Sequence, residues 1–351
     1  MKRNTILLLA LACIIAAGCA KEPKKDTKAA DKAYFEALIS LRYHDAEPTA
    51  NGAYILEKEE GTGEGISSED HPYIFVEYTA TDIEGNVSTT TVEKVAKQVG
   101  TYNQSYYYGT HVWYFGDTYS GIYAGLEEGM EGMKIDERRK IAVPYWLCTY
   151  DRYSNAQKYL DEATEGGSHI IYDVTLRDRC PDIKEWQGQQ LDAYAKTYLD
   201  GADSTHIAGD EELDKFGFYF VSKGIAREED LTYEMPSDTT LYLNYTGRLL
   251  SGKVFDTTDE KTAKDAGLYS PSRSYGPVKI NRNDDFSKIS YGSDESDLIG
   301  GFKAAIYLMH PMEKAVTAFW SGLGYQATGS GSIIPPYSPL VFELELVAKP
   351  E

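Results

Sequence analysis

Positive charge is scarce in this chain, and the shortage argues against one large class of partner. The 351 residues include 55 acidic and 35 basic side chains, which gives a formal net charge of -20 at pH 7. A protein that binds nucleic acid needs a basic surface, because it must neutralise phosphates and release their counterions. We therefore expect no nucleic-acid partner.

The sequence also lacks the patterns that hold metals, phosphates or catalytic nucleophiles. The histidines show no paired spacing with cysteines or carboxylates that indicates zinc, and the acidic run 203–214 lacks the ligand spacing of a calcium loop. No glycine-rich phosphate loop precedes a helix, and no Gly-x-Ser-x-Gly motif has a supporting context. We predict neither a metal nor a cofactor.

Long hydrophobic runs are absent after the first 17 residues, so no later segment is long enough to cross a membrane. Lys2 and Arg3 precede an apolar run from Ile6 to Ala17, which is too short for a mature transmembrane helix and ends in small residues before Cys19. This segment resembles a bacterial lipoprotein signal, which implies that residues 1–18 are removed and that Cys19 carries the lipid. An ordinary cleaved signal with an incidental cysteine is the alternative.

The residues after Cys19 fit an anchored protein. Residues 19–29 are rich in lysine and poor in apolar side chains, so we predict a solvated tether. The chain is then expected to be exported and lipid-anchored to the cell envelope, on the periplasmic face or at the cell surface. Only Cys148 and Cys180 follow the signal, and in an exported chain they form either a disulfide bond or two separate thiols.

An internal repeat organises most of the chain. Three residues recur at a constant offset of 176 positions: Gly125, Met133 and Glu137 in the first copy match Gly301, Met309 and Glu313 in the second. The constant offset predicts a duplicated domain. The first copy is predicted to begin near residues 52–56, to include a strand at 73–79 and to close with a strand at 170–176, because alternating and β-branched residues are typical of half-buried strands.

Two helices are predicted outside the copies. Residues 30–43 have an apolar side formed by Tyr34, Phe35, Leu38 and Leu41, which must pack on another element. Pro181 opens a second helical stretch that ends at Asp200-Gly201 and places four apolar residues at helical spacing: Ile183, Trp186, Tyr194 and Tyr198. We predict that this connector docks on a neighbouring domain; a partner-binding helix is the alternative.

Several apolar and aromatic blocks follow one another in the last third of the chain. They are Tyr245-Thr246-Gly247, Gly252-Lys253-Val254-Phe255-Asp256, Leu298-Ile299-Gly300-Gly301-Phe302, Tyr325, Ile333-Ile334-Pro335-Pro336 and Leu340-Val341-Phe342. In this order they resemble the FKBP family of peptidyl-prolyl cis/trans isomerases. The resemblance implies an α+β fold with two FKBP-like domains, each an antiparallel twisted β-sheet wrapped on a short helix.

The predicted organisation of the whole chain follows from these patterns. It consists of a signal peptide (1–18), a tether (19–29), an N-terminal helix (30–47), a degenerate FKBP-like domain (48–179), a helical connector (180–211) and an FKBP-type isomerase domain (212–351).

Proline isomerisation requires an apolar pocket rather than a nucleophile. The X-Pro amide loses its resonance as it twists, and the uncatalysed barrier is about 20 kcal/mol. A pocket lowers this barrier when it removes the amide from water and hydrogen-bonds the flanking carbonyls in the twisted geometry. Such a site needs an aromatic bowl with few hydrogen-bond donors.

The resemblance assigns roles to individual residues of the second copy. Asp256 matches the pocket carboxylate that polarises the amide, Tyr325 matches a hydroxyl donor to a substrate carbonyl, and Ile299 offers a backbone N–H. The resemblance implies that the substrate-binding walls, floor and closing loop are Tyr245, Phe255, Leu298, Phe302, Ile333, Ile334 and Phe342.

The second copy departs from the family pattern in two places. Phe302 stands where the floor is often Trp, which keeps the aromatic surface but removes an N–H. The polar stretch 257–297 is much longer than in the family and forms either a rim that reads substrate or a surface decoration. Either residues 278–280 or residues 286–291 supply the strand that carries a further wall.

The first copy is predicted to be non-catalytic. Tyr78 is retained, but residues 85–89 contain neither the Phe nor the Asp of the pocket, the Ile-Ile-Pro-Pro run is missing, and only Tyr150 lies near the place of the tyrosine donor. The aromatic residues at 106–108 and 113–115 form either buried strand residues or a surface for unfolded clients.

Two hypotheses about function follow. The preferred one is a peptidyl-prolyl isomerase that assists the folding of exported or envelope proteins, with proline-containing unfolded polypeptides as partners and macrolide FKBP ligands as further occupants of the pocket. The alternative is a non-catalytic client-binding or chaperone lipoprotein whose FKBP-like pockets are vestigial.

Overall fold

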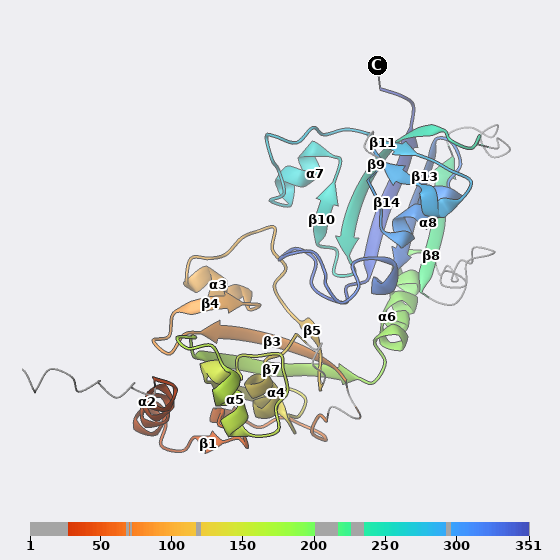
Figure 1. Ribbon diagram of the computed structural model, residues 1–351. Coiled ribbons are helices and arrows are strands. Elements are labelled where there is room, and N and C mark those ends of the chain that lie inside the picture. Colours follow the sequence, from red (N-terminus) through yellow and green to blue (C-terminus); the bar gives the residue numbers. More distant parts are fainter. Residues whose placement is uncertain are drawn as a thin grey trace, which may run out of the picture.

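The computed structural model describes residues 27–67, 70, 72–116, 121–200, 217–225, 235–292 and 296–350. They form two lobes, each built on an antiparallel sheet, and one helix connects them (Figure 1). The predicted signal, the lipidation site Cys19 and the acidic run 203–214 lie outside the described residues. In the part of the chain that is described, no helix combines the length and the hydrophobicity needed to span a bilayer.

The first lobe contains a seven-stranded sheet. Its order is β1 (Glu47–Pro48), β2 (Tyr54–Glu59), β6 (Arg138–Val143), β7 (Ile170–Cys180), β3 (Tyr73–Thr81) and β4 (Val87–Thr90), and β5 (His111–Tyr114) also pairs with β3. Its helices are α3 (Glu93–Gln98), α4 (Ala124–Met130), the 3-10 turn η1 (Tyr145–Leu147) and α5 (Ala156–Glu162). All paired strands run antiparallel.

The second lobe repeats this plan. Its sheet order is β12 (Ser290–Tyr291), β11 (Val278–Asn281), β9 (Thr240–Leu249), β14 (Leu340–Val347), β13 (Glu313–Phe319) and β8 (Phe218–Ile225), and β10 (Val254–Thr257) also pairs with β9. Its helices are α7 (Glu260–Asp265), η3 (Phe286–Lys288), α8 (Gly300–Leu308) and η4 (Ser321–Leu323). The strand series β2-β6-β7-β3 thus corresponds to β8-β13-β14-β9, and the predicted duplication is confirmed.

The repeated residues have the same structural task in both lobes. A Cβ on Gly125 would lie 2.9 Å from Val143 Cγ1, and a Cβ on Gly301 would lie 2.4 Å from the Phe319 ring, so each glycine lets its helix approach the sheet. The buried carboxylates are also equivalent: Glu137 accepts the N–H of Lys134 at 2.8 Å, and Glu313 accepts that of His310 at 2.7 Å.

The N-terminal helix α2 (Thr27–Arg42) packs on the first lobe through a narrower face than predicted. Phe35 and Ile39 are buried, whereas Tyr34 and Leu41 are 56% and 77% exposed, so their assignment to the packed side is wrong. The reason is local: the Phe35 ring stacks on His169 at 4.6 Å and meets Trp146 edge-on at 5.7 Å, which sets the helix rotation. The helix also takes in residues 27–29 of the predicted tether.

The connector helix α6 (Ile183–Tyr198) begins at Asp182, whose carboxylate accepts the N–H groups of Lys184 and Glu185. It leaves the end of β7 and runs beside the second sheet (Figure 1). Its first turn contacts the first lobe through Trp186, and its later turns pack against the second sheet in a cluster that includes Leu191 and Val341. The predicted docking on neighbouring domains is confirmed, although Tyr198 is exposed.

Cys148 and Cys180 are free thiols, so the alternative of a disulfide bond between them is wrong. Burial raises the pKa of Cys148 and that of Cys180 to about 12. Both are therefore thiols rather than thiolates near neutral pH, and neither has the character of a reactive nucleophile.

The long polar stretch of the second lobe is largely shared with the first. Residues 278–281 form β11 beside the central β9, and residues 290–291 of the other candidate segment form the short β12 that pairs with β11. Both candidate segments thus contain a strand, and the further wall stays a prediction. In each lobe, a short helix is followed by two stacked tyrosines before the next strand, which is β5 in the first lobe and β11 in the second. Tyr102 stacks on Tyr108 at 5.5 Å, and Tyr269 stacks on Tyr275 at 5.6 Å. A lysine lies over the first ring of each pair. Up to β11, this stretch is therefore a common feature of both copies.

Candidate active site in the second domain

Aromatic rings from four elements form a bowl on one face of the second sheet. Tyr245 of β9 meets Phe302 of α8 edge-on at 5.5 Å, and Phe302 lies 4.8 Å from Phe342 of β14. Phe255 of β10 completes the bowl at 5.4 Å from Phe342. The structure therefore brings together the four aromatic residues that the sequence predicted as walls and floor.

A glycine and a bulge admit Phe255 to the bowl. The pairing of β10 with β9 shifts register between Val254 and Asp256, which is where Phe255 lies. Across from it stands Gly247, where an added Cβ would lie 2.4 Å from the Phe255 ring and 2.9 Å from the Phe342 ring. A side chain at position 247 would push these rings apart, so glycine is required for this packing.

Asp256 lies at the edge of the bowl and accepts three hydrogen bonds. Its donors are the Tyr245 hydroxyl at 2.6 Å, the Arg273 guanidinium at 2.5 Å and the Thr257 N–H at 2.8 Å. Arg273 comes from the polar segment before β11 and was not among the predicted site residues. The sequence offered one signal for this contact: Arg273 is the single arginine between Asp256 and the start of β11.

Two tyrosines keep their hydroxyl protons. Burial, followed by the negative charge of Asp256, raises the pKa of Tyr245 well above its ordinary value. The pKa of Tyr325 is raised by the same two causes in the same order, although its side chain is 37% exposed. The charge of Asp256 thus acts on Tyr325, which lies at the rim of the bowl. Both hydroxyls remain hydrogen-bond donors at neutral pH.

Leu298 and Ile299 lie at the start of α8 and pack on the core of the second lobe while half-buried. Ile299 is the N-cap residue in an extended conformation, and its carbonyl accepts the N–H of Phe302 at 3.1 Å. Among the described residues, none accepts a hydrogen bond from the Ile299 N–H. This is consistent with the predicted backbone donor at this position.

Ile333 and Ile334 lie in the loop between β13 and β14. The loop closes on itself, because Ser330 donates to the Ile334 carbonyl at 2.7 Å and Ile334 donates back at 3.1 Å. Gly329 permits this approach: it has a φ of +64°, and a Cβ there would lie 2.3 Å from the Ile334 oxygen. Ile334 is buried in the core and Ile333 is half-buried.

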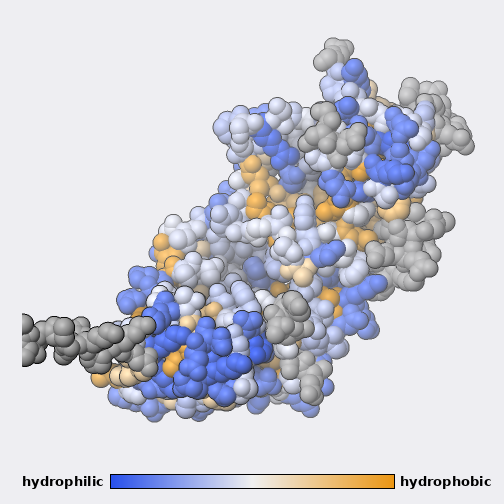
Figure 2. All heavy atoms as spheres, in the orientation of Figure 1, coloured by the Kyte–Doolittle hydropathy of each residue, from blue (hydrophilic) through white to orange (hydrophobic). Residues whose placement is uncertain are grey.

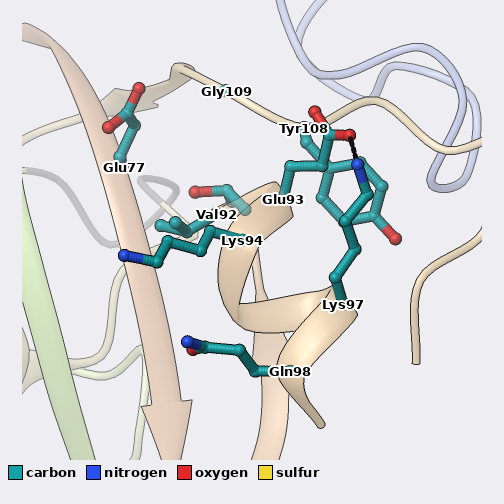
Figure 3. Close-up of a pocket in the computed structure, with 9 residues that line it drawn as sticks. Glu77, Val92, Glu93, Lys94, Lys97, Gln98, Tyr108 and Gly109 are labelled. Atoms are coloured by element: carbon teal, nitrogen blue, oxygen red, sulfur yellow. Dashed lines mark ion pairs between the residues drawn. The ribbon is translucent and has the colours of Figure 1, made fainter. Parts of the chain in front are cut away.

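Two wide hollows lie away from this bowl. One, of about 770 Å³, lies in the first lobe between β3 and α3, with Glu77 on the strand side and Lys94 and Gln98 on the helix side (Figure 3). Its counterpart in the second lobe, of about 730 Å³, is lined by Asn244 and Thr246. These alternate with Tyr245 and Gly247 along β9, so the hollow opens on the opposite sheet face. Side chains of both charges line the two hollows. Neither hollow therefore offers the apolar surroundings that would desolvate an amide or hold an apolar ring.

Hydrophobic residues reach the surface of the second lobe between β10 and α8, whereas the first lobe is mostly hydrophilic around α5 (Figure 2). The side-chain inventory of the first lobe agrees with this difference. The strand register places Ser88 and Thr89 where Phe255 and Asp256 stand in the second lobe. The first lobe therefore lacks one wall of the bowl and its carboxylate, as predicted.

The second lobe is thus an α+β domain in which an antiparallel sheet wraps on a short apolar helix, with an aromatic bowl beside a tyrosine and a carboxylate. Residues 232–347 match the family described as FKBP-type peptidyl-prolyl cis-trans isomerase. The match covers about a third of the chain, within the second lobe, and shows that this segment is similar to the FKBP-type isomerase family.

Similar proteins cover different parts of the chain. A macrophage infectivity potentiator from Trypanosoma cruzi is 30% identical over 111 residues, which are 32% of this chain and 43% of that protein. The match thus spans less than half of that relative's length.

Solved structures of the same kind are also similar at low identity. The three FKBP domains of wheat FKBP73 are 17% identical, with 84% of this chain and 94% of that one covered at a TM-score of 0.29. A peptidyl-prolyl cis-trans isomerase from Pseudomonas syringae is 19% identical, with 47% and 92% covered at a TM-score of 0.30.

Proposed function

We propose that the second domain catalyses cis/trans isomerisation of X-Pro peptide bonds. One observation carries the proposal: the rings of Phe255, Phe302 and Phe342 form a bowl with Tyr245, whose hydroxyl donates to Asp256 at the edge. This combination offers an apolar seat for a proline ring next to a fixed dipole. It suits a reaction whose barrier lies in the loss of amide resonance.

Desolvation and hydrogen bonding are the proposed sources of catalysis. In water the planar amide is stabilised by its larger polarity, so transfer into the bowl favours the twisted form. The Tyr325 hydroxyl and the Ile299 N–H then hold the carbonyls that flank the proline. No bond to a side chain forms, and the substrate leaves with its composition unchanged.

The proposed role of Asp256 is to orient its neighbours. Three donors already engage its carboxylate, so in this mechanism it serves as a fixed hydrogen-bond acceptor that aligns Tyr245. Because Tyr245 and Tyr325 both keep their protons, we expect kcat/KM to be constant from pH 6 to 9.

The biological setting is part of the proposal. The N-terminal pattern that ends at Cys19 supports an exported chain with a lipid anchor in the cell envelope. The partners would be unfolded or exported polypeptides that contain proline, and macrolide ligands of FKBP domains would compete for the bowl. A role in folding of envelope proteins follows from this location and this chemistry.

Protease-free isomerisation of short X-Pro peptides by the full chain tests the proposal. We expect acceleration that falls in Tyr325→Phe by up to about tenfold, since a neutral hydrogen bond contributes about 0.5–1.5 kcal/mol. Asp256→Ala should lower it further, because it releases both Tyr245 and Arg273. Tyr269→Phe, which removes an exposed hydroxyl of the same domain, is the matched control.

The opposite outcome is equally informative. If the folded chain accelerates no X-Pro peptide, the isomerase proposal fails, and a non-catalytic client-binding lipoprotein becomes the better reading. Far-UV circular dichroism of each variant shows whether the chain is folded when the assay is made.

A further inference from the structure

The loop that carries Tyr325, Ile333 and Ile334 is held by a residue outside the second sheet. Gln187 of α6 is fully buried, at 0% exposure, and uses both ends of its amide. Its Nε2 donates to Ser321 Oγ at 3.0 Å and to the Tyr337 carbonyl at 2.9 Å, and its Oε1 accepts the Ser321 N–H at 2.8 Å. One side chain therefore joins the two ends of the loop 321–337.

The contact continues through the loop as a closed ring of hydrogen bonds. The Ser321 carbonyl accepts the N–H of Gln326 at 2.9 Å, and the Gln326 carbonyl accepts the N–H of Tyr337 at 2.8 Å. Gln187 closes the ring between Tyr337 and Ser321. Tyr325 directly precedes Gln326, which has a φ of +50°, so the ring determines where the Tyr325 side chain leaves the backbone.

In the first lobe, the N–H group that corresponds to that of Ser321 finds its acceptor within the same lobe. Tyr145 begins η1 as Ser321 begins η4, and the Tyr145 N–H donates to His169 Nδ1 at 3.2 Å. His169 directly precedes β7 of the same lobe. In the second lobe the equivalent group depends on the connector, so the pocket loop is completed only when α6 is docked.

The first lobe adds two ties to the same loop. The Tyr107 N–H donates to the Ser332 carbonyl at 2.8 Å, next to Ile333, and the Tyr73 ring meets Tyr337 edge-on at 5.4 Å. These contacts lie at the tip and at the base of the loop. They stabilise the loop in addition to Gln187. Among the described residues, Gln187 is the only one whose side chain forms hydrogen bonds with both Ser321 and Tyr337.

We propose that Gln187 is a positioning residue for the isomerase pocket, which aims the Tyr325 hydroxyl by fixing both ends of its loop. The inference rests on the proposed function, because it assigns Gln187 a part in that reaction. A buried amide without partners is costly, so the ring and the docking of α6 stabilise each other. The connector is thus a component of the pocket as well as a spacer between lobes.

Gln187→Met in the full chain tests the proposal, with Gln189→Met on the exposed side of the same helix as control. Methionine keeps the volume but removes every hydrogen bond, and a misdirected Tyr325 hydroxyl should lower kcat by no more than its removal does, up to about tenfold. We expect kcat to fall by about this factor with KM changed less than about twofold. In a Tyr325→Phe background the same substitution should have almost no further effect, which a merely structural role would not predict.

Hydrogen exchange of the Ser321 amide gives a readout independent of activity. We expect faster exchange in Gln187→Met and unchanged exchange in Gln189→Met. Unchanged kcat in Gln187→Met, or a full loss added to that of Tyr325→Phe, would overturn the proposal. An inactive wild-type chain would refute the proposed function, and with it this role, while the exchange data would still show whether Gln187 fixes the loop.

If Gln187→Met does not fold, Gln187→Asn serves instead. It keeps the amide but shortens the side chain by one methylene, so the group cannot reach Ser321 and Tyr337 together. The same fall in kcat and the same dependence on Tyr325 are expected, and wild-type kinetics in this variant would contradict the inference.

Discussion

The two lobes share a backbone plan and differ in how they fill it. The paired positions of β3, β4 and β5 in the first lobe match those of β9, β10 and β11 in the second at one constant offset, which is 167 positions here (240 − 73 = 167). Gly247 faces the Phe255 ring in the second lobe, and the same two positions hold Ala80 and Ser88 in the first. The aromatic wall and the glycine therefore occur together, and the loss of one removes the need for the other.

Interactions that support the backbone are present in both lobes. The threonine pairs Thr79–Thr90 and Thr246–Thr257 lie 2.7 Å and 2.8 Å apart between their hydroxyl oxygens. The stacked tyrosines and the buried glutamates recur as well. The comparison shows that this fold does not need the aromatic bowl or its carboxylate.

The largest expected effect comes from Gly247→Ala, which breaks the match between glycine and aromatic wall. The added Cβ overlaps the Phe255 ring, so we expect a loss of about 1–3 kcal/mol in the free energy of unfolding, as for other overpacked cores. Isomerase activity should fall sharply because the wall is displaced. Urea unfolding and the peptide assay measure the two effects.

A second substitution sharpens this prediction. Gly247→Ala combined with Phe255→Ser reproduces the first lobe's pair, so it should recover much of the lost stability and none of the activity. The reciprocal control, Ala80→Gly, should cost about 0.5–1 kcal/mol and leave isomerisation unchanged. Wild-type activity in Gly247→Ala would contradict the proposed wall.

Acid should weaken the first lobe through His169. Burial lowers its pKa from the ordinary 6.5, and its Nδ1 must stay unprotonated to accept the Tyr145 N–H. The unfolded chain binds the proton more readily, so this stabilisation is present above pH 6.5 and is lost as pH falls through the lowered pKa. We expect a loss of about 1 kcal/mol, the size of one hydrogen bond, in thermal unfolding followed from pH 7 to 5.

Variants separate this histidine from the others. His169→Gln should flatten the acid dependence at the cost of some stability at pH 7, whereas His44→Gln, at an exposed position, should leave it unchanged. His111 is half-buried and desolvation lowers its pKa, so a residual slope in His169→Gln should disappear when His111 is replaced too. An unaltered slope in the double variant would refute the assignment.

Arg273→Ala should have modest effects of similar size on stability and on the reaction. The ion pair with Asp256 is about one-third exposed on each side, so its removal should change the free energy of unfolding by no more than about 1 kcal/mol. We expect kcat/KM to fall by up to about fivefold, because the carboxylate that aligns Tyr245 loses a fixed partner. Tyr106→Ala, at the equivalent place in the first lobe, should leave the kinetics unchanged.

The smallest effect should come from the lysines that lie over the stacked tyrosines. Lys97 and Lys264 occupy equivalent places, at 4.7 Å and 4.8 Å from the ring centres, and both are exposed. We expect Lys97→Met and Lys264→Met to lower Tm slightly and by the same amount, and Lys94→Met to leave it unchanged. Unequal shifts would show that the two copies of this feature have different tasks.

The aromatic residues of the second-lobe bowl could be predicted from the sequence. Tyr245, Phe255, Phe302 and Phe342 could be predicted because each lies in a short block whose order along the chain is distinctive. The roles of Asp256, Tyr325 and Ile299 in catalysis stay predictions, although the structure places the first two within electrostatic reach of each other. The lipid site at Cys19 also stays a prediction.

Other parts could not be found in the sequence. Arg273 returns to Asp256 across a turn whose shape depends on the stacked tyrosines, and a polar segment contains no pattern that announces such a turn. The packed face of α2 was misjudged because Phe35 meets His169, which is more than a hundred residues away. Gln187 looked like one of several polar residues on a helix.

The sequence by itself determined the duplication, the strands and the aromatic composition of one pocket, because glycines, buried glutamates and alternating apolar residues report local requirements of backbone and burial. Only the tertiary structure decided which partners complete that pocket. The docking of α6 and of the first lobe against the loop 321–337 brings Gln187, Tyr107 and Tyr73 onto it. Such contacts depend on the geometry of two packed domains, and hydrogen bonds between distant residues leave no periodic trace in a sequence.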